Sequence, residues 1–367
     1  MDHLPGALPP ETQLLILRDV VIFMATSLCL LMGVLVLQKL GVERRERLEE
    51  TILAQLRRRM DAPEPGRSGD DARTWETVPP RVLARVLARQ AHAPGNPLQD
   101  RETGPAPRLI ERLEPELRHR HWGRRATAHE ALSALRVPGL RGRLLRAARD
   151  EPDERVFAAQ LRAAAALTRS AVDLDDLVSA LRAGPSLSRT YVDAVLRVAF
   201  GQIAARQGDA ATAQVVGALL ENLNASDSLL ADALGAASAL HLPSAAERAD
   251  RLLGDPDLPA PLRLTCLRTI GRLHDEHPRL IEAARDTDWK SRTVAASHLG
   301  GRSPASLAAL IGLLQDRDFH VRRNAATSLA ASGPDGIRAM RVIAELGDAY
   351  ASDAAGNALL AREMRDA

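Results

Sequence analysis

Aromatic residues are scarce in this chain of 367 residues, and their scarcity restricts the fold. They make up 2% of the sequence, although hydrophobic residues as a whole make up 46%. The apolar content is mostly Ala, Leu and Val, which suit closely packed helices, and few residues favour strands strongly. The composition therefore disfavours an all-β fold and predicts an all-α protein.

Cysteine is equally scarce, since only Cys29 and Cys266 are present and they lie far apart. This pair excludes a disulfide framework and a cysteine-based zinc site. The chain also lacks the phosphate-binding glycine loop, the dinucleotide fingerprint and the nucleophile elbow. Its net charge is +2, so the chain as a whole is not a polycation. No sequence motif of catalysis is present.

One segment near the N-terminus lacks charge altogether. The 18 residues from Val20 to Leu37 contain no charged side chain, and as a helix they would extend about 27 Å, close to the thickness of a hydrocarbon core. A secretory signal fits poorly because the residues before the run include Asp2, Glu11 and Asp19 rather than a basic cluster. A buried soluble helix fits poorly because the run is apolar on every face. We predict a tail at 1–13 and a single transmembrane helix at 14–41.

Basic residues predict the orientation of this helix. Only Arg18 precedes the apolar run closely, whereas seven basic residues follow it, at positions 39, 44, 45, 47, 57, 58 and 59. By the positive-inside rule, the C-terminal side faces the cytoplasm. The expected location is a bacterial inner membrane, with the N-terminus outside and the C-terminal domain cytoplasmic.

Two connecting segments are predicted next. Residues 42–60 carry an apolar stripe at helical spacing, which predicts an amphipathic helix that either self-associates or packs on a partner, or lies at the lipid headgroups. Residues 61–107 are rich in Pro and Gly and predict a linker. A short helix at 80–90 interrupts the linker, with Val82, Leu83, Val86 and Leu87 on one face. That face docks either on a partner or membrane, or on the chain's own C-terminal domain.

Residues 108–367 form a helical, repetitive domain. Its clearest pair of repeats aligns without a gap, each position lying 30 residues from its counterpart. The matched positions are Asp286, Asp288, Trp289, Arg292, Ala295, Ala296, Leu299 and Gly300 with Asp316, Asp318, Phe319, Arg322, Ala325, Ala326, Leu329 and Ala330. About eight units are expected. One helical hairpin cannot bury its apolar face alone, so the repeats predict an α-solenoid of stacked hairpins.

The pattern at Leu310–Leu329 resembles HEAT repeats, and most closely the short variety of about thirty residues first associated with phycobilin lyases. The resemblance implies a ladder of Asp and Arg side chains between neighbouring units. By that resemblance, Asp316 or Asp318 would act with Arg322, and Asp286 or Asp288 with Arg292. The implied role is structural.

One enzymatic class and one histidine cluster are weighed against the residues. The resemblance also reaches the deoxyhypusine hydroxylases, which bind two irons through several His-Glu pairs, but only His129-Glu130 is present here. The cluster from His274 to His277 precedes Pro278 and is expected in a solvated loop. No metal, cofactor or catalytic residue is therefore expected.

Charge is concentrated at the start of the repeat domain. Residues 108–149 contain eleven arginines and four glutamates, a local net charge of +7. This excess predicts either contact with anionic lipid or an acidic partner, or a solvated end of the solenoid. The candidate basic patch consists of Arg118, Arg120, Arg124, Arg125, Arg141, Arg143 and Arg146.

These features together predict a membrane-anchored, non-catalytic adaptor whose cytoplasmic solenoid binds a protein. A membrane enzyme or assembly, such as a polysaccharide-synthesis glycosyltransferase, is the expected kind of partner, and nucleic acid is not expected. Two alternatives remain open at this point: a lyase-like or metal-dependent enzyme of the HEAT families, and a regulator that responds to anionic lipid. The oligomeric state is not predicted.

Overall fold

A computed structural model describes residues 78–91, 106–135, 137 and 139–366, together with scattered residues between 24 and 54. The predicted tail at 1–13 and most of the predicted transmembrane helix, juxtamembrane helix and linker lie outside the described residues. No helix among the described residues is both long and apolar enough to cross a bilayer.

Every regular element of the described residues is an α-helix. In chain order they are α2 (Pro80–Ala91), α3 (Ala106–Leu117), α4 (Trp122–Ser133), α5 (Leu140–Arg149), α6 (Glu154–Ala166), α7 (Ala171–Ala183), α8 (Arg189–Gln207), α9 (Asp209–Asn222), α10 (Ser228–Ala239), α11 (Pro243–Leu253), α12 (Ala260–Leu273), α13 (Pro278–Ala283), α14 (Trp289–His298), α15 (Pro304–Leu314), α16 (Phe319–Ala331), α17 (Pro334–Leu346) and α18 (Ala349–Asp366).

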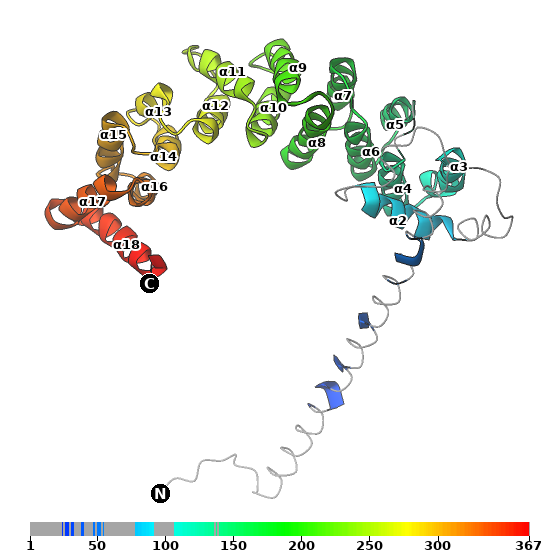
Figure 1. Ribbon diagram of the computed structural model, residues 1–367, viewed down its shortest axis with the longest axis horizontal. Coiled ribbons are helices and arrows are strands. Elements are labelled where there is room, and N and C mark those ends of the chain that lie inside the picture. Colours follow the sequence, from blue (N-terminus) through cyan, green and yellow to red (C-terminus); the bar gives the residue numbers. More distant parts are fainter. Residues whose placement is uncertain are drawn as a thin grey trace, which may run out of the picture.

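The helices stack in two rows and form an arch (Figure 1). Even-numbered helices make the inner row, in which each packs on the next from α2 to α18. Odd-numbered helices make the outer row, and the described chain from α3 to α18 forms eight outer–inner pairs. This is the architecture of an α-solenoid, in which each unit contacts mainly its neighbours.

Small and branched apolar side chains set the spacing of the inner row. Ala295 and Ala296 of α14 and Ala325 of α16 are fully buried, and Ala326 of α16 is nearly so. Because alanine has only a methyl group, the two helices approach closely, and Leu329 fills the layer between the rows. The alignment of repeats in the sequence therefore corresponds to a repeated packing unit.

In the two aligned repeats, aspartates stabilise the short turn that joins the two helices of the unit. The amide of Asp288 donates to Asp286 Oδ1 at 2.9 Å, and Asp288 then caps α14 by accepting from the amide of Lys290. One repeat later, Asp316 and Asp318 make the same arrangement before α16. Each carboxylate satisfies backbone N–H groups that a helix start leaves without partners.

Helix α2 extends the inner row by one helix, ahead of the first pair. Leu83 and Leu87 are fully buried, Val86 is nearly so, and the helix packs against α4 and α3. The sequence left open whether this helix docks on a partner or membrane, or on the chain's own repeat domain. In the structure it packs on the repeat domain. Ile52, from the predicted juxtamembrane stripe, is also buried and belongs to the same core.

Candidate functional site: an arginine ladder, an aromatic rim and a basic pocket

Arg292 connects two successive units. Its guanidinium donates twice to the Asp316 carboxylate, from Nε to Oδ2 at 2.6 Å and from Nη2 to Oδ1 at 3.0 Å. Its remaining nitrogen, Nη1, donates to the carbonyls of Asp286 and Thr287, at 2.9 and 3.0 Å. Arg292 therefore clamps the turn of its own unit to the turn of the next.

The same clamp recurs elsewhere in the solenoid. Arg125 donates to Glu151 of the next unit and, through Nη1, to the carbonyls of His119 and Arg120. Arg322 makes the two carbonyl contacts of its own turn, but its guanidinium lies 5.1 Å from the ring centroid of Tyr350 rather than beside a carboxylate. Arg125 and Arg292 thus pair with the acidic residue that lies two positions before the capping Asp of the next unit. Arg322 pairs with neither Asp316 nor Asp318 through its guanidinium and instead meets Tyr350 of the next unit, because Asp316 pairs with Arg292 and Asp318 caps α16.

The ladder also explains the charge states within it. Burial alone would raise the pKa of Asp316, but the hydrogen bonds from Arg292 and from the Asp318 amide hold that pKa below its usual range. The hydrogen bond to Asp316 raises the pKa of Arg292. Both side chains therefore remain charged, and each depends on the other to be stable at this depth.

The predicted basic patch is largely committed to ion pairs. Arg118 and Arg143 pair with Glu114, Arg124 with Glu116, Arg125 with Glu151, and Arg141 with Asp173 and Asp176. Three of these acidic residues lie beyond residue 149 and so outside the window that gave the excess of +7. Only Arg120 and Arg146 of the seven form no ion pair with described residues.

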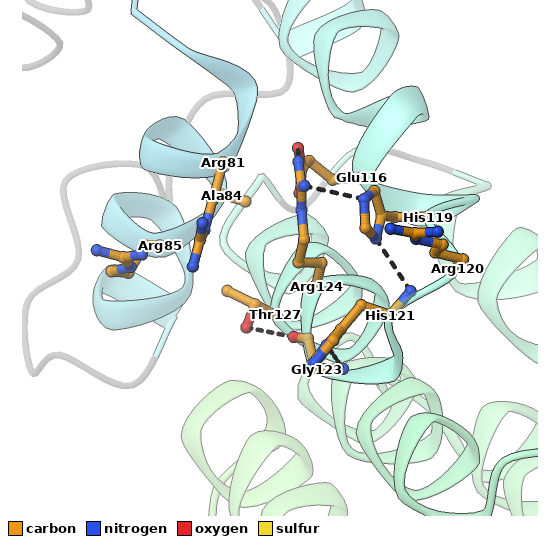
Figure 2. A pocket seen from close by; sticks show the side chains of 10 residues that line it. All are labelled: Arg81, Ala84, Arg85, Glu116, His119, Arg120, His121, Gly123, Arg124 and Thr127. Carbon is orange, nitrogen blue, oxygen red and sulfur yellow. Dashed lines mark hydrogen bonds and ion pairs between the residues drawn. The ribbon is translucent and has the colours of Figure 1, made fainter.

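A basic pocket lies between α2 and the start of α4 (Figure 2). Its cavity volume is about 380 Å³. In Figure 2, α2 supplies one wall, and the end of α3, the α3–α4 turn and the first turns of α4 supply the other. The lining residues are Arg81, Ala84, Arg85, Glu116, His119, Arg120, His121, Gly123, Arg124 and Thr127. We call this cavity the arginine pocket.

A buried pair forms the fixed part of the arginine pocket. Glu116 is only 3% exposed, and Arg124 donates to both of its oxygens, with Nε at 2.6 Å from Oε2. The hydrogen bond from Arg124 is the main reason that the pKa of Glu116 lies below its usual value, and the charge of Arg81 lowers it further. His119 is held between Arg124 and the backbone amide of His121.

The remaining cations of the pocket are unpaired within the described residues. Arg81, Arg85 and Arg120 form no hydrogen bond or ion pair through their guanidinium groups there, whereas Arg124 is neutralised by Glu116. The lining therefore carries an excess of three positive charges when the histidines are neutral. The sequence showed Arg81 and Arg85 one turn apart on a short helix, but it did not show that this helix faces Arg120.

Exposed aromatic side chains mark one end of the inner-row helices. They are Trp122, Tyr191, Trp289, Phe319 and Tyr350, between 38% and 69% exposed. Each lies in the first turn of an inner helix, namely α4, α8, α14, α16 or α18. We call Trp289, Phe319 and Tyr350, which belong to three successive units, the aromatic rim. Composition pointed only to the scarcity of aromatics and not to this placement.

Imidazole and guanidinium side chains lie against the rings of the aromatic rim. The rings of Trp289 and His320 stack at 6.0 Å between centroids, and His320 also contacts Phe319 edge-on. Arg323 lies 5.9 Å from the Phe319 ring, and Arg322 lies over Tyr350. The rim thus combines aromatic faces with guanidinium groups, which are the side chains enriched where proteins bind one another.

The histidines that were considered as metal ligands in the sequence lie in two separate places. His129 is buried, and burial lowers its pKa to about 4; its Nε2 lies 3.0 Å from Gln160. His277 caps α13, and its ring lies 5.8 Å from that of His274. Among the described residues, no group of three or more His, Cys, Asp or Glu side chains is placed to hold a metal ion.

Two rows of antiparallel helices joined by capped turns and an Arg–Asp clamp define a helical-repeat protein. Residues 277–361 match the family model for HEAT repeats, which supports the description of the chain as a HEAT-repeat protein. A comparison with curated proteins finds no match. HEAT repeats generally mediate protein–protein interaction, so an interaction scaffold is the class of function that the fold supports.

Proposed function

We propose that this chain is a membrane-anchored, non-catalytic adaptor whose solenoid binds a protein through the aromatic rim. The observation that carries the proposal is the rim itself. Three exposed rings stand on successive units of the segment that matches HEAT repeats, in a chain with few aromatics. Because Trp, Tyr and Arg dominate binding energy at protein interfaces, a row of them indicates a binding edge.

The uncharged run from Val20 to Leu37 supports the anchor, and the basic residues after it support a cytoplasmic solenoid. An anchor confines adaptor and partner to the same plane and so raises their effective concentration. The partner that benefits most is itself a membrane enzyme or assembly, such as a polysaccharide-synthesis glycosyltransferase.

Co-purification tests the proposal and gives its first prediction. The full chain, extracted in mild detergent, is expected to retain a protein partner. The triple variant Trp289→Ala, Phe319→Ala, Tyr350→Ala is expected to lose at least about tenfold in recovered partner, since even one rim residue that acts as a binding hot spot contributes about 2 kcal/mol. Mass spectrometry of the eluates measures the ratio.

Three other exposed apolar side chains provide a matched control. Val342→Ala, Leu346→Ala and Leu360→Ala remove exposed apolar surface from α17 and α18 outside the rim. This control is expected to recover the partner as well as the unaltered chain does. Equal recovery with the rim variant, or a chain that always purifies alone, would contradict the proposal.

A further inference from the structure

We propose that the arginine pocket is a binding site for a phosphate monoester, either on a lipid headgroup or on a soluble small molecule. The inference is independent of the aromatic rim, which lies at the other end of the solenoid. It begins from the three guanidinium groups of Arg81, Arg85 and Arg120, which line one cavity and have no ion-pair partner among the described residues. Arginine pairs with phosphate oxygens through two parallel N–H donors, so several arginines in one cavity favour this ligand.

The other cavities show what distinguishes this one. A larger cavity of about 530 Å³ near α8 and α10 contains a single arginine, Arg189, and that residue pairs with Asp232. A cavity near α9 and α11 contains Arg251, which pairs with Glu221. A third contains Arg118 and Arg143, both paired with Glu114. Of these four cavities, the arginine pocket is therefore the one with guanidinium groups that lack ion-pair partners among the described residues.

The carboxylate of Glu116 in the pocket does not prevent an anion from binding there. Glu116 is buried and its charge is matched by Arg124, which donates to both of its oxygens. The first turn of α4 also faces the pocket through Gly123 and Arg124, and the positive end of a helix dipole adds to the potential there. An incoming phosphate thus meets three unpaired cations and one neutralised pair.

The size of the pocket indicates more than a bare phosphate ion. A volume of about 380 Å³ lies at the lower end of the range for small-molecule sites, roughly 300–1,000 Å³. A phosphate attached to a glycerol, sugar or nucleoside would occupy it. Both walls contribute arginines, with Arg81 and Arg85 on α2 and Arg120 on the α3–α4 turn, so a bound phosphate would bridge the linker helix and the first repeat.

This bridging predicts a measurable consequence. A ligand that binds only the docked form of α2 multiplies the docking equilibrium constant by one plus the ratio of its free concentration to its dissociation constant. Saturating pyrophosphate, used as a soluble probe, is therefore expected to slow hydrogen exchange of the α2 amides several-fold in the detergent-solubilised full chain. Amides of α14 and α16 are expected to be unaffected, since coupling in a solenoid falls off beyond neighbouring units.

Paired variants test whether the pocket is responsible. Arg81→Ala with Arg120→Ala is expected to weaken pyrophosphate binding, measured by calorimetry, by roughly tenfold or more, because charge-assisted hydrogen bonds to phosphate are lost. Arg182→Ala with Arg189→Ala removes the same charge from exposed arginines elsewhere and is expected to change affinity less than twofold. Because both Arg81 and Arg120 are exposed, the variant is expected to keep its fold, and circular dichroism checks this.

A second arm separates the two sources of phosphate. The full chain in phosphatidylcholine nanodiscs, with or without phosphatidic acid, reports on the headgroup. Slower exchange of α2 only with phosphatidic acid, lost in the Arg81→Ala, Arg120→Ala variant, indicates a lipid ligand. Pyrophosphate binding without any effect of phosphatidic acid indicates a soluble ligand. No binding of either probe, or equal binding by the pocket variant and the unaltered chain, overturns the proposal.

Discussion

Replacing Arg292 with alanine is expected to lower the free energy of unfolding of the C-terminal repeats by about 3 kcal/mol, because breaking a buried ion pair leaves an uncompensated charge. Arg292 and Asp316 are each about 10% exposed at the side chain. The substitution also leaves the carbonyls of Asp286 and Thr287 without their donor. Urea unfolding of the full chain, followed by circular dichroism and by hydrogen exchange of α14 and α16, measures the loss.

Two further variants make this prediction specific. Arg292→Lys keeps the charge but cannot donate to both Asp316 oxygens and two carbonyls at once, so an intermediate loss is expected. Arg317→Ala removes an exposed arginine whose side chain has no ion-pair partner among the described residues, and its effect is expected to stay within about 0.5 kcal/mol. Similar losses for Arg292→Ala and Arg317→Ala would show that the clamp does not hold the units together.

Substituting Leu83 and Leu87 together with aspartate is expected to release α2 from the solenoid. Both side chains are fully buried. The free-energy cost of burying an unpaired carboxylate at either position exceeds the docking free energy of α2. Because a solenoid unfolds locally, the loss is limited to the docking free energy of α2, and the repeats beyond α4 remain folded. Trypsin is then expected to cleave after Arg81, Arg85 or Arg89 at least about a hundredfold faster than in the unaltered chain.

The matched control is Val172→Asp, the same kind of change at a valine of α7 that is 70% exposed. It is expected to leave the cleavage rate in α2 unchanged. The double aspartate variant is also expected to lose pyrophosphate binding, since one wall of the arginine pocket is then absent. Slow cleavage of α2 in that variant would mean that Leu83 and Leu87 do not hold the helix.

The repeats were the part of the fold most accessible from the sequence. The gapless alignment of Asp286–Gly300 with Asp316–Ala330 predicted stacked helical hairpins, because alanine pairs, an N-cap Asp and a following Arg each have a local physical reason. What the alignment left undecided was which carboxylate the Arg meets. Two aspartates lie two residues apart, and only the structure shows that Asp318 caps its helix while Asp316 faces Arg292.

Charge counting along the sequence failed for a related reason. Arg125 and Arg141 were assigned to a basic patch because their partners, Glu151 and Asp173, lie a repeat further along the chain. In a solenoid, residues about one repeat apart are neighbours. A charge count that ends at residue 149 therefore includes these arginines but leaves out the carboxylates with which they pair.

The arginine pocket could not be predicted from local pattern at all. Arg81 and Arg120 are separated by most of a proline-rich segment, and only the burial of Leu83 and Leu87 against the first repeat brings α2 to the α3–α4 turn. The sequence came closer to predicting the aromatic rim. Trp289 and Phe319 were aligned in the sequence, but their exposure depends on the first turn of each inner helix facing outward from the stack.

Crosslinking in intact cells tests the central claim most directly, namely that the rim of a membrane-held solenoid binds a protein. A photoactivatable amino acid at Phe319 is expected to capture one protein reproducibly, in the membrane fraction, whereas the same amino acid at the exposed Val172 of the outer row is expected not to capture it. Absence of a product from Phe319, or the same product from both positions, would contradict the account.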